Sequence, residues 1–290
     1  NDGMLNTFTI SAAGAITSGV QLEHDVSYNW YNSLIQLDAD TYVLAYTGVN
    51  DDGYIKTFTV PSNGSSITQV ASLEHDEVKG HFSSLVKVDA NTVALAYASG
   101  TSLQGYIKTF TIPADGSSIT QVTSYRHDSI QGKYNSFVQA DSDTYVLAYS
   151  GSGNDGFIKT FTIPADGSSV TQVQKVEHDN VFGQYNSLVK FSGGSDSYLL
   201  AYGGPDTGGS TAYDGFIKTF SIPVDGSTIT ETYELEYSTA QGEHNSLVQM
   251  DENSFALAES GSSDDGFIIT FDVRGSDQVA PSITSVTLAN

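Results

Sequence analysis

Short stretches rich in Val, Ile, Thr, Tyr and Phe run along the whole chain, separated by clusters of Gly, Pro, Asn, Asp and Ser. Such stretches and such punctuation are typical of β-strands joined by turns. None of the stretches places its apolar residues at the spacing of three and four that marks one face of a helix. The pattern therefore predicts an all-β protein with almost no helix.

The same group of strands returns at a nearly constant interval. A glycine opens one strand of each group, at Gly3, Gly53, Gly105, Gly156, Gly215 and Gly266. A repeat of roughly 50 residues indicates a solenoid or a propeller. One period contains four predicted strands, at 185–191, 197–203, 215–222 and 229–237. Four antiparallel strands per period predict the blade of a β-propeller.

Polarity predicts the order of the four strands, which we label a to d from the axis outward. Strand a carries Asn-Ser-Leu-Val, whose small residues suit the crowded axis, and strand b carries Val-Leu-Ala-Tyr, which is apolar on both faces. Strand d is the most polar and suits the outer edge. Strand c repeats a lysine, which we expect to be a solubilising edge charge, at Lys56, Lys108, Lys159 and Lys218.

Counting the strands predicts five blades. Four complete sets are followed by a fifth, 245–273, that lacks strand d, and we expect the segment 16–23 to supply this strand and close the ring. The segments 4–10 and 267–273 then compete for one strand c position. The second should hold it because a short loop connects it to its own strand b. The first should be ordered elsewhere, and this strand or the C-terminal tail could support self-association.

The repeat ends near residue 274, and residues 275–290 read as a linker followed by an alternating first strand. The segment Ala-Pro-Ser-Ile-Thr-Ser-Val-Thr-Leu-Ala-Asn at 280–290, together with the Asp-Gly-aromatic-Ile repeats, resembles propeller arrays of large secreted or cell-surface proteins of bacteria. In those proteins such lead-ins open immunoglobulin-like modules. The resemblance implies an adhesin-like parent and an extracellular or cell-surface location.

The charge of the chain narrows the class of partner. The 290 residues include 34 acidic and 11 basic side chains, for a formal net charge of −23. Such a chain would be repelled by nucleic acid and by anionic membrane surfaces, so we expect neither as a partner. There is no cysteine and no apolar run long enough to span a membrane. These features exclude disulfide and thiol chemistry and argue against membrane insertion.

The connection from strand d to the next strand a carries the candidate binding residues. It repeats a His-Asp pair, an aromatic residue or His, and an Asn-Ser pair, with departures in the second and fifth copies. Aromatic rings can stack on a pyranose, while Asn, Asp and His can bind its hydroxyl groups. The alternative is that these residues hydrogen-bond loop backbone and hold the blades in register. The candidates are His24, Asp25, Tyr31, Asn32, His75, Asp76, His127, Asp128, Tyr134, Asn135, His178, Asp179, Tyr185, Asn186, His244 and Asn245.

These features predict a non-enzymatic binding module that recognises glycans or another surface protein. A structural spacer or a self-assembling filament subunit is the alternative, and a glycan-acting hydrolase is a further one, disfavoured because no asymmetric acidic or basic cluster is evident. Glu259 stands out because it replaces a repeated tyrosine. We expect no cofactor. Calcium is a weaker alternative that rests on the b–c loop carboxylates Asp51, Asp52, Asp155, Asp264 and Asp265.

Overall fold

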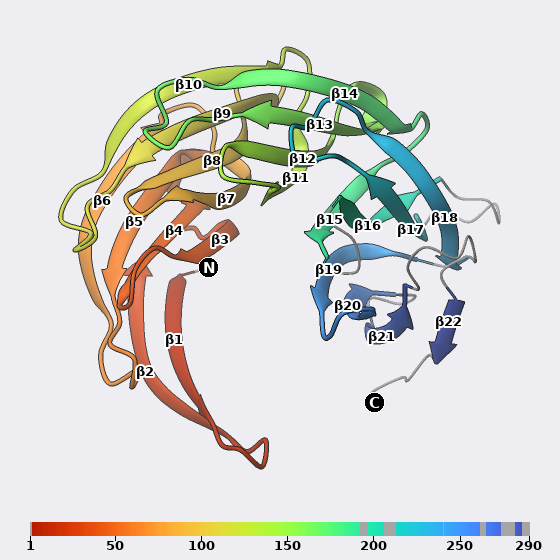
Figure 1. The fold of residues 1–290 in the computed structure, drawn as a ribbon. Coiled ribbons are helices and arrows are strands. Elements are labelled where there is room, and N and C mark those ends of the chain that lie inside the picture. Colours follow the sequence, from red (N-terminus) through yellow and green to blue (C-terminus); the bar gives the residue numbers. More distant parts are fainter. Residues whose placement is uncertain are drawn as a thin grey trace. The chain divides into compact units, whose positions relative to one another are not determined.

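The structure is a computed structural model that describes residues 2–191, 196–205, 213–239, 241–261, 265–273 and 282–285. These residues form five antiparallel sheets of four strands, one sheet of two strands and two short 3-10 turns, and none of them lies in an α-helix (Figure 1). The five sheets are the blades of a β-propeller. The predictions of an all-β fold and of five blades are therefore confirmed.

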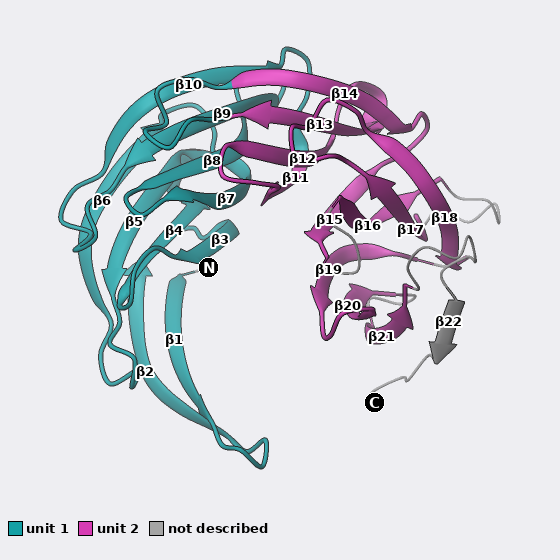
Figure 2. Ribbon diagram, viewed as in Figure 1, with its two compact units in different colours: residues 1–133, 163–170 teal, residues 134–162, 171–290 magenta. Residues whose placement is uncertain are grey.

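The chain divides into two compact units, which are described separately (Figure 2). Unit 1 comprises residues 1–133 and 163–170, and unit 2 comprises residues 134–162 and 171–290. The elements of unit 1 are β1 (Gly3–Ile10), β2 (Ile16–Asp25), β3 (Trp30–Gln36), β4 (Thr41–Thr47), η1 (Val49–Asp51), β5 (Gly53–Thr59), β6 (Thr68–Asp76), β7 (His81–Asp89), β8 (Thr92–Ser99), β9 (Gln104–Thr111) and β10 (Thr120–Asp128). The remaining elements are β11 (Lys133–Gln139), β12 (Thr144–Ser150), η2 (Ser152–Asn154), β13 (Gly156–Thr162), β14 (Thr171–Asp179), β15 (Gln184–Lys190), β16 (Ser197–Gly204), β17 (Asp214–Ser221), β18 (Thr230–Ser238), β19 (Glu243–Gln249), β20 (Ser254–Ser260), β21 (Gly266–Asp272) and β22 (Ser282–Ser285).

The strand order within the sheets follows the polarity of the sequence. Each period gives one sheet in chain order, such as β3-β4-β5-β6, which confirms the assignment of strands a to d. In β4 the residues Val43, Leu44, Ala45 and Tyr46 are at most 2% exposed, because both faces of strand b are covered. In β6, the strand d of the same sheet, exposed and partly buried positions alternate, as at an outer edge.

Neighbouring sheets of unit 1 pack face to face through the side chains that the period repeats. Leu37 and Ile55 of one sheet share a buried apolar cluster with Leu95 and Phe110 of the next. Burying a side chain of this size stabilises a fold by about 1.5–3 kcal/mol. A hydrogen bond also fixes how the two sheets are aligned, because the hydroxyl of Thr57 donates to the carbonyl of Gly116, in the c–d turn of the next sheet, at 2.7 Å. The tight c–d turns thus also hold the sheets in register.

The strand that completes the last sheet differs from the prediction. The expectation that the segment 16–23 would join this sheet is wrong, because β2 pairs with β1 while β22 pairs with β21. β1 and β2 are consecutive and joined by a short turn, so their pairing closes a much smaller loop than pairing between the chain ends would. β21 holds the strand c position of its sheet, as expected, and the segment 4–10 is ordered within β1. The module boundary expected after residue 274 stays a prediction, since residues 274–281 and 286–290 lie outside the described residues.

The repeated lysines of strand c are buried rather than exposed at an edge. Lys56, Lys108, Lys159 and Lys218 are each at most 8% exposed. The expectation of solubilising charges was wrong because strand c is covered on both faces, so its polar residues need partners inside the protein. The ammonium group of Lys56 finds one by donating to the carbonyl of His24 at 2.5 Å, and that of Lys218 donates to the carbonyl of His178 at 2.5 Å.

Candidate functional site

The histidines of the repeated His-Asp pairs lie inside the protein. His24, His75, His127 and His178 are between 4% and 7% exposed. Within each unit the ring packs edge-on against a strand b tyrosine of the following sheet, with centroids 5.0 Å apart for His24 and Tyr46. Burial, together with the nearby lysine, lowers the pKa of His75 to about 3, so this ring is neutral at pH 7.

The aspartates of these pairs hydrogen-bond to the same tyrosines. Asp25 accepts a hydrogen bond from the hydroxyl of Tyr46 at 2.8 Å, and Asp76 accepts one from Tyr97 at 2.8 Å. In unit 2 the hydroxyl of Tyr202 donates to Asp179 at 3.1 Å. These contacts join one sheet to the next, which is the alternative role considered for these pairs. Their assignment to ligand binding stays a prediction.

The aromatic positions of the same connections form a more accessible feature, here called the aromatic row. Each residue is the second of a strand a and has a positive φ, from 52° to 58°. This backbone conformation is unfavourable for a bulky side chain, and such strain concentrates at functional sites. Within each unit neighbouring rings are in contact, with centroids 4.3 Å apart for Tyr31 and Phe82 in unit 1 and 4.5 Å apart for Tyr134 and Tyr185 in unit 2. In unit 1 the row comprises Tyr31 and Phe82, and in unit 2 it comprises Tyr134, Tyr185 and His244.

A β-bulge produces this unusual backbone. In β3 the pairing with β4 shifts register between Trp30 and Ser33, and the corresponding strands β7, β15 and β19 shift at the same place. A bulge inserts an extra residue and re-aims its side chain. The asparagine after the aromatic residue supports the loop, since the amide of Asn186 donates to the carbonyl of Gly183 at 3.0 Å. Asn245 likewise donates to Gly242 at 3.1 Å, whereas Asn32 is exposed.

The residue before each aromatic position changes from period to period, and the predictions from sequence missed it. These variable residues are Trp30, His81, Lys133, Gln184 and Glu243. A search for what the periods share passes over such a position, whereas aligning the periods and marking their departures would have found it. The position lies beside a strained aromatic residue in every sheet. It is therefore where one chain can place different chemistry in each blade.

At His81, in unit 1, the variable position places an imidazole beside a carboxylate. Its Nε2 lies 3.6 Å from Oδ1 of Asp51, and the ammonium group of Lys79 lies 3.6 Å from Oδ2 of the same carboxylate. The ring of Tyr31 lies 5.2 Å from that of His81. Asp51 ends η1 with a φ of 69°, and its carbonyl accepts a hydrogen bond from the amide of Gly80 at 2.9 Å, which fixes this turn against the loop of His81.

The environment sets the protonation of this cluster. Burial lowers the pKa of His81, although the charge of Asp51 opposes this effect. The imidazole is therefore mostly neutral at pH 7 and able to accept a proton. Burial, with a contribution from Asp51, raises the pKa of Tyr31, so its hydroxyl remains a donor. The cluster thus contains a base, a carboxylate, a hydrogen-bond donor and the cation of Lys79.

The b–c loop carboxylates considered for calcium are mainly turn residues. Asp52 is buried, and its carbonyl accepts a hydrogen bond from the amide of Gly48 at 2.9 Å. Asp155 and Asp265 make the same backbone contact with Gly151 and Gly261. Asp264 lies outside the described residues. Among the residues that the structure describes, no three His, Asp or Glu side chains gather where they could hold a metal ion, and calcium binding stays a proposal.

Comparison with solved structures shows the fold in other proteins at low sequence identity. A protein assigned as a 6-phosphogluconolactonase from Bacteroides fragilis has a TM-score of 0.72 and 13% identity, over 98% of this chain and 77% of that chain. The periplasmic gluconolactonase PpgL of Pseudomonas aeruginosa has a TM-score of 0.70 and 15% identity, over 95% of this chain and 77% of that chain. Sqt1 of Chaetomium thermophilum, bound to the N-terminus of the ribosomal protein L10, has a TM-score of 0.52 and 17% identity, over 92% of this chain and 64% of that chain. No protein-family model and no curated protein matches the chain.

These comparisons correct the functional prediction. The expectation of a non-enzymatic, lectin-like module is contradicted, because the activities named among these similar structures are those of lactonases, which are hydrolytic enzymes. Glycan partners receive no support, whereas the Sqt1 complex shows a protein partner on a similar fold. In the described part of the chain, no helix has the length and apolar character needed to cross a membrane.

Proposed function

We propose that the protein is a hydrolase that opens the ring of a small lactone, with His81 and Asp51 as its acid–base pair. The observation that carries this proposal is the approach of the two side chains, 3.6 Å apart, beside the strained Tyr31. Among the variable residues only His81 combines an imidazole with a carboxylate at this distance within the described part of the chain. The lactonases among the structures of similar fold support the choice of substrate class.

The chemistry of the cluster suits the hydrolysis of an ester bond within a ring. The neutral imidazole of His81 takes a proton from water as the water oxygen bonds to the lactone carbonyl carbon. The hydroxyl of Tyr31 and the ammonium group of Lys79 are donors for the negative charge that forms on the carbonyl oxygen. The bond to the ring oxygen then breaks, and that oxygen takes the proton from His81. The product is the open-chain hydroxy acid.

Charge favours a neutral lactone over a phosphorylated one. The formal net charge of −23 repels anions, and the carboxylate of Asp51, 3.6 Å from the ammonium group of Lys79, offsets the positive charge of this lysine. A neutral sugar lactone also suits Tyr31 of the aromatic row, since the C–H groups on one face of a sugar ring can pack on an aromatic face. We therefore expect gluconolactone to be a better substrate than its 6-phosphate.

A location outside the cytoplasm is part of the proposal. The periplasmic gluconolactonase of similar fold supports it, as does the resemblance of the repeats to modules of secreted bacterial proteins. An adhesin-like parent with an immunoglobulin-like module after the propeller would fit the same location. Localising the tagged parent protein by cell fractionation tests this part of the proposal independently of any activity.

The proposed activity can be tested with the purified full chain. Acid release from glucono-δ-lactone and from its 6-phosphate is followed in a pH-stat, and the spontaneous rate is subtracted. The proposal expects hydrolysis of the neutral lactone that rises with enzyme concentration, and a lower kcat/KM for the phosphorylated one. If neither lactone is opened faster than in buffer, the proposal fails.

A further inference from the structure

The hairpin β1–β2 contacts the sheet β3-β4-β5-β6 through the same kinds of hydrogen bond by which β5 and β6 contact the sheet β7-β8-β9-β10. The hydroxyl of Thr7 donates to the carbonyl of Gly64 at 2.9 Å, just as Thr57 donates to Gly116 at 2.7 Å one period later. Tyr46 donates to Asp25 of β2, as Tyr97 donates to Asp76 of β6, in both cases at 2.8 Å. The hairpin, a sheet of two strands beside the five complete blades, therefore corresponds to strands c and d of an incomplete blade.

Strands a and b of this blade are not among the described residues. β5, the corresponding strand c of the next sheet, pairs with β4 on one edge and with β6 on the other. In the part of the chain that the structure describes, β1 pairs only with β2. The other edge of β1, which corresponds to the edge of β5 that pairs with β4, therefore has no strand partner for its backbone groups among these described residues. Such an edge is a template for an added strand.

The apolar side chains that strands a and b would cover are exposed here and buried elsewhere. Leu34 of β3 is 50% exposed, whereas Leu85, its equivalent in β7, is 6% exposed. Leu85 is covered by a cluster that includes Leu37, directly after strand a of the preceding sheet, and Val43, in its strand b. Leu34 lacks this cover. Strands with the apolar residues of strands a and b would therefore fit against it.

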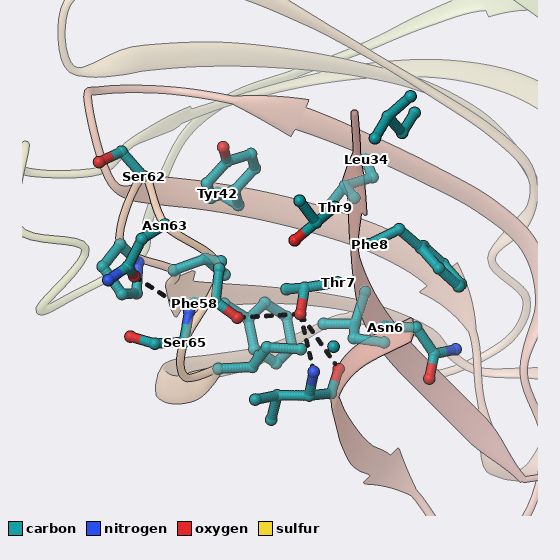
Figure 3. Close-up of a pocket in the computed structure, with 18 residues that line it drawn as sticks. Asn6, Thr7, Phe8, Thr9, Leu34, Tyr42, Phe58, Ser62, Asn63 and Ser65 are labelled. Atoms are coloured by element: carbon teal, nitrogen blue, oxygen red, sulfur yellow. Dashed lines mark hydrogen bonds between the residues drawn. The ribbon is translucent and has the colours of Figure 1, made fainter. Parts of the chain in front are cut away.

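A cavity of about 810 Å³ lies at this position (Figure 3). Its walls are β1 on one side and β3, β4 and β5 on the other, and the labelled side chains of Leu34, Tyr42, Phe58 and Thr9 surround it in the close-up. The c–d turn between β5 and β6, at 61–65, also lines the cavity. The cavity is therefore bounded by a strand edge and by apolar side chains, which together suit a β-strand.

We propose that this cavity and the open edge of β1 bind a β-hairpin with the pattern of this chain's own strands a and b. The apolar strand of the hairpin, of the Val-Leu-Ala-Tyr type, pairs antiparallel with β1 through backbone hydrogen bonds. The second strand, of the Asn-Ser-Leu-Val type, covers Leu34. This is recognition by strand addition, in which the main chain gives affinity and side-chain pockets give specificity. The inference is independent of the proposed hydrolase activity.

The single tryptophan of the chain provides a signal for the test. Trp30 begins β3, the strand that also carries Leu34, and is 49% exposed. A synthetic peptide with the sequence of residues 81–99, which contains no tryptophan, is titrated into the full chain. The proposal expects a saturable blue shift of Trp30 emission, together with slower amide exchange in residues 4–10. A peptide with the same composition in scrambled order should give neither change.

Two matched variants distinguish binding at this site from nonspecific binding to exposed apolar residues. Leu34→Glu should weaken peptide binding at least tenfold and leave the fold intact, because Leu34 is half exposed before binding. Val248→Glu changes an exposed apolar residue of β19, which is 56% exposed, and should leave binding unchanged. As a covalent version, a copy of residues 81–103 placed directly before Asp2 should raise the melting temperature and shift Trp30 emission to the blue.

Three results would overturn the proposal. The first is the absence of an emission shift and of protection in β1 with both the peptide and the fused copy. The second is equal binding of the scrambled peptide. The third is protection of β1 that depends on protein concentration without peptide, which would make a second copy of the chain the occupant.

Discussion

The hydroxyl of Tyr237 donates a hydrogen bond of 2.7 Å to a carboxylate oxygen of Glu259. Tyr237 occupies the position that the other periods give to the buried histidine, and Glu259 replaces the strand b tyrosine. The two departures from the repeat therefore compensate each other in one contact between neighbouring sheets. Burial raises the pKa of Glu259 to about 6, although the bond from Tyr237 opposes the shift.

Glu259→Gln should make the protein more stable at neutral pH. Because the folded state holds the pKa near 6 while the unfolded value is near 4.5, the folded carboxylate is penalised once the pH exceeds 4.5. The variant should gain up to about 2 kcal/mol in unfolding free energy at pH 8 and little at pH 4. Urea denaturation at both pH values measures this gain. Glu252→Gln, at an exposed turn residue of the same sheet, should show no such dependence, and an equal gain at pH 4 would contradict the account.

His75→Gln should reduce the loss of stability in acid. The folded state holds the pKa of His75 near 3, whereas the unfolded chain takes up its proton near 6.5. As the pH falls from 6.5 to 3, the contribution of His75 to the unfolding free energy should therefore decrease by about 1.4 kcal/mol per pH unit. Above pH 6.5 this contribution is fully present, because the ring is neutral in both states. Denaturation curves of variant and wild type between pH 7 and pH 4 should converge as the pH falls. The exposed His244, changed to Gln, serves as control, and parallel curves for His75→Gln would refute the burial effect.

Lys108→Met tests the role of the strand c lysines. The ammonium group of Lys108 donates to the carbonyl of His75 and lies 3.7 Å from Asp76. Methionine keeps most of the apolar stem but leaves this carbonyl without its donor, so we expect a loss of about 1–3 kcal/mol in unfolding free energy. Lys175→Met, at an exposed position of β14, should cost less than about 1 kcal/mol. Equal, negligible losses would restore the interpretation as solubilising charges.

The sequence predicted the sheets well because their information is local and repeated. The apolar stretch Val43–Tyr46 and the alternating β6 specify a covered strand and an edge strand by themselves. The partners of β2 and β21 could not be predicted in the same way. The edges of β2 and β21 have similar chemistry. Which strand pairs with each of them depends on loop lengths and on the segment after residue 273.

The candidate site was harder to predict for a different reason. A repeated residue such as His75 is an obvious candidate for a binding site. In this protein, however, the repeated His-Asp pairs make contacts between sheets. His81 occurs once, and its proximity to Asp51 arises from a positive φ and a bulge that the residue types do not indicate. The buried lysines were misjudged because their partners are backbone carbonyls of a preceding sheet, which the local pattern of strand c does not reveal.

The pH dependence of lactone hydrolysis should report His81. Because burial lowers its pKa below the ordinary value of 6.5, the neutral and active form should persist into mildly acidic solution. The enzyme-catalysed kcat/KM should rise with pH and reach half its plateau below pH 6.5. Initial rates between about pH 4.5 and pH 7, corrected for spontaneous opening, measure this profile. A midpoint well above 6.5 would show that His81 is not the base.

The most direct test of the proposed function is kcat/KM for glucono-δ-lactone in the His81→Gln and Asp51→Asn variants, beside wild type and the exposed-residue control Glu252→Gln. Circular dichroism and melting temperature establish that each variant is folded. The account predicts that His81→Gln loses activity by about 100-fold or more, as expected for a general base, and that Asp51→Asn loses less. Glu252→Gln should retain wild-type activity. Folded variants of His81 and Asp51 that hydrolyse the lactone as fast as wild type would contradict the account.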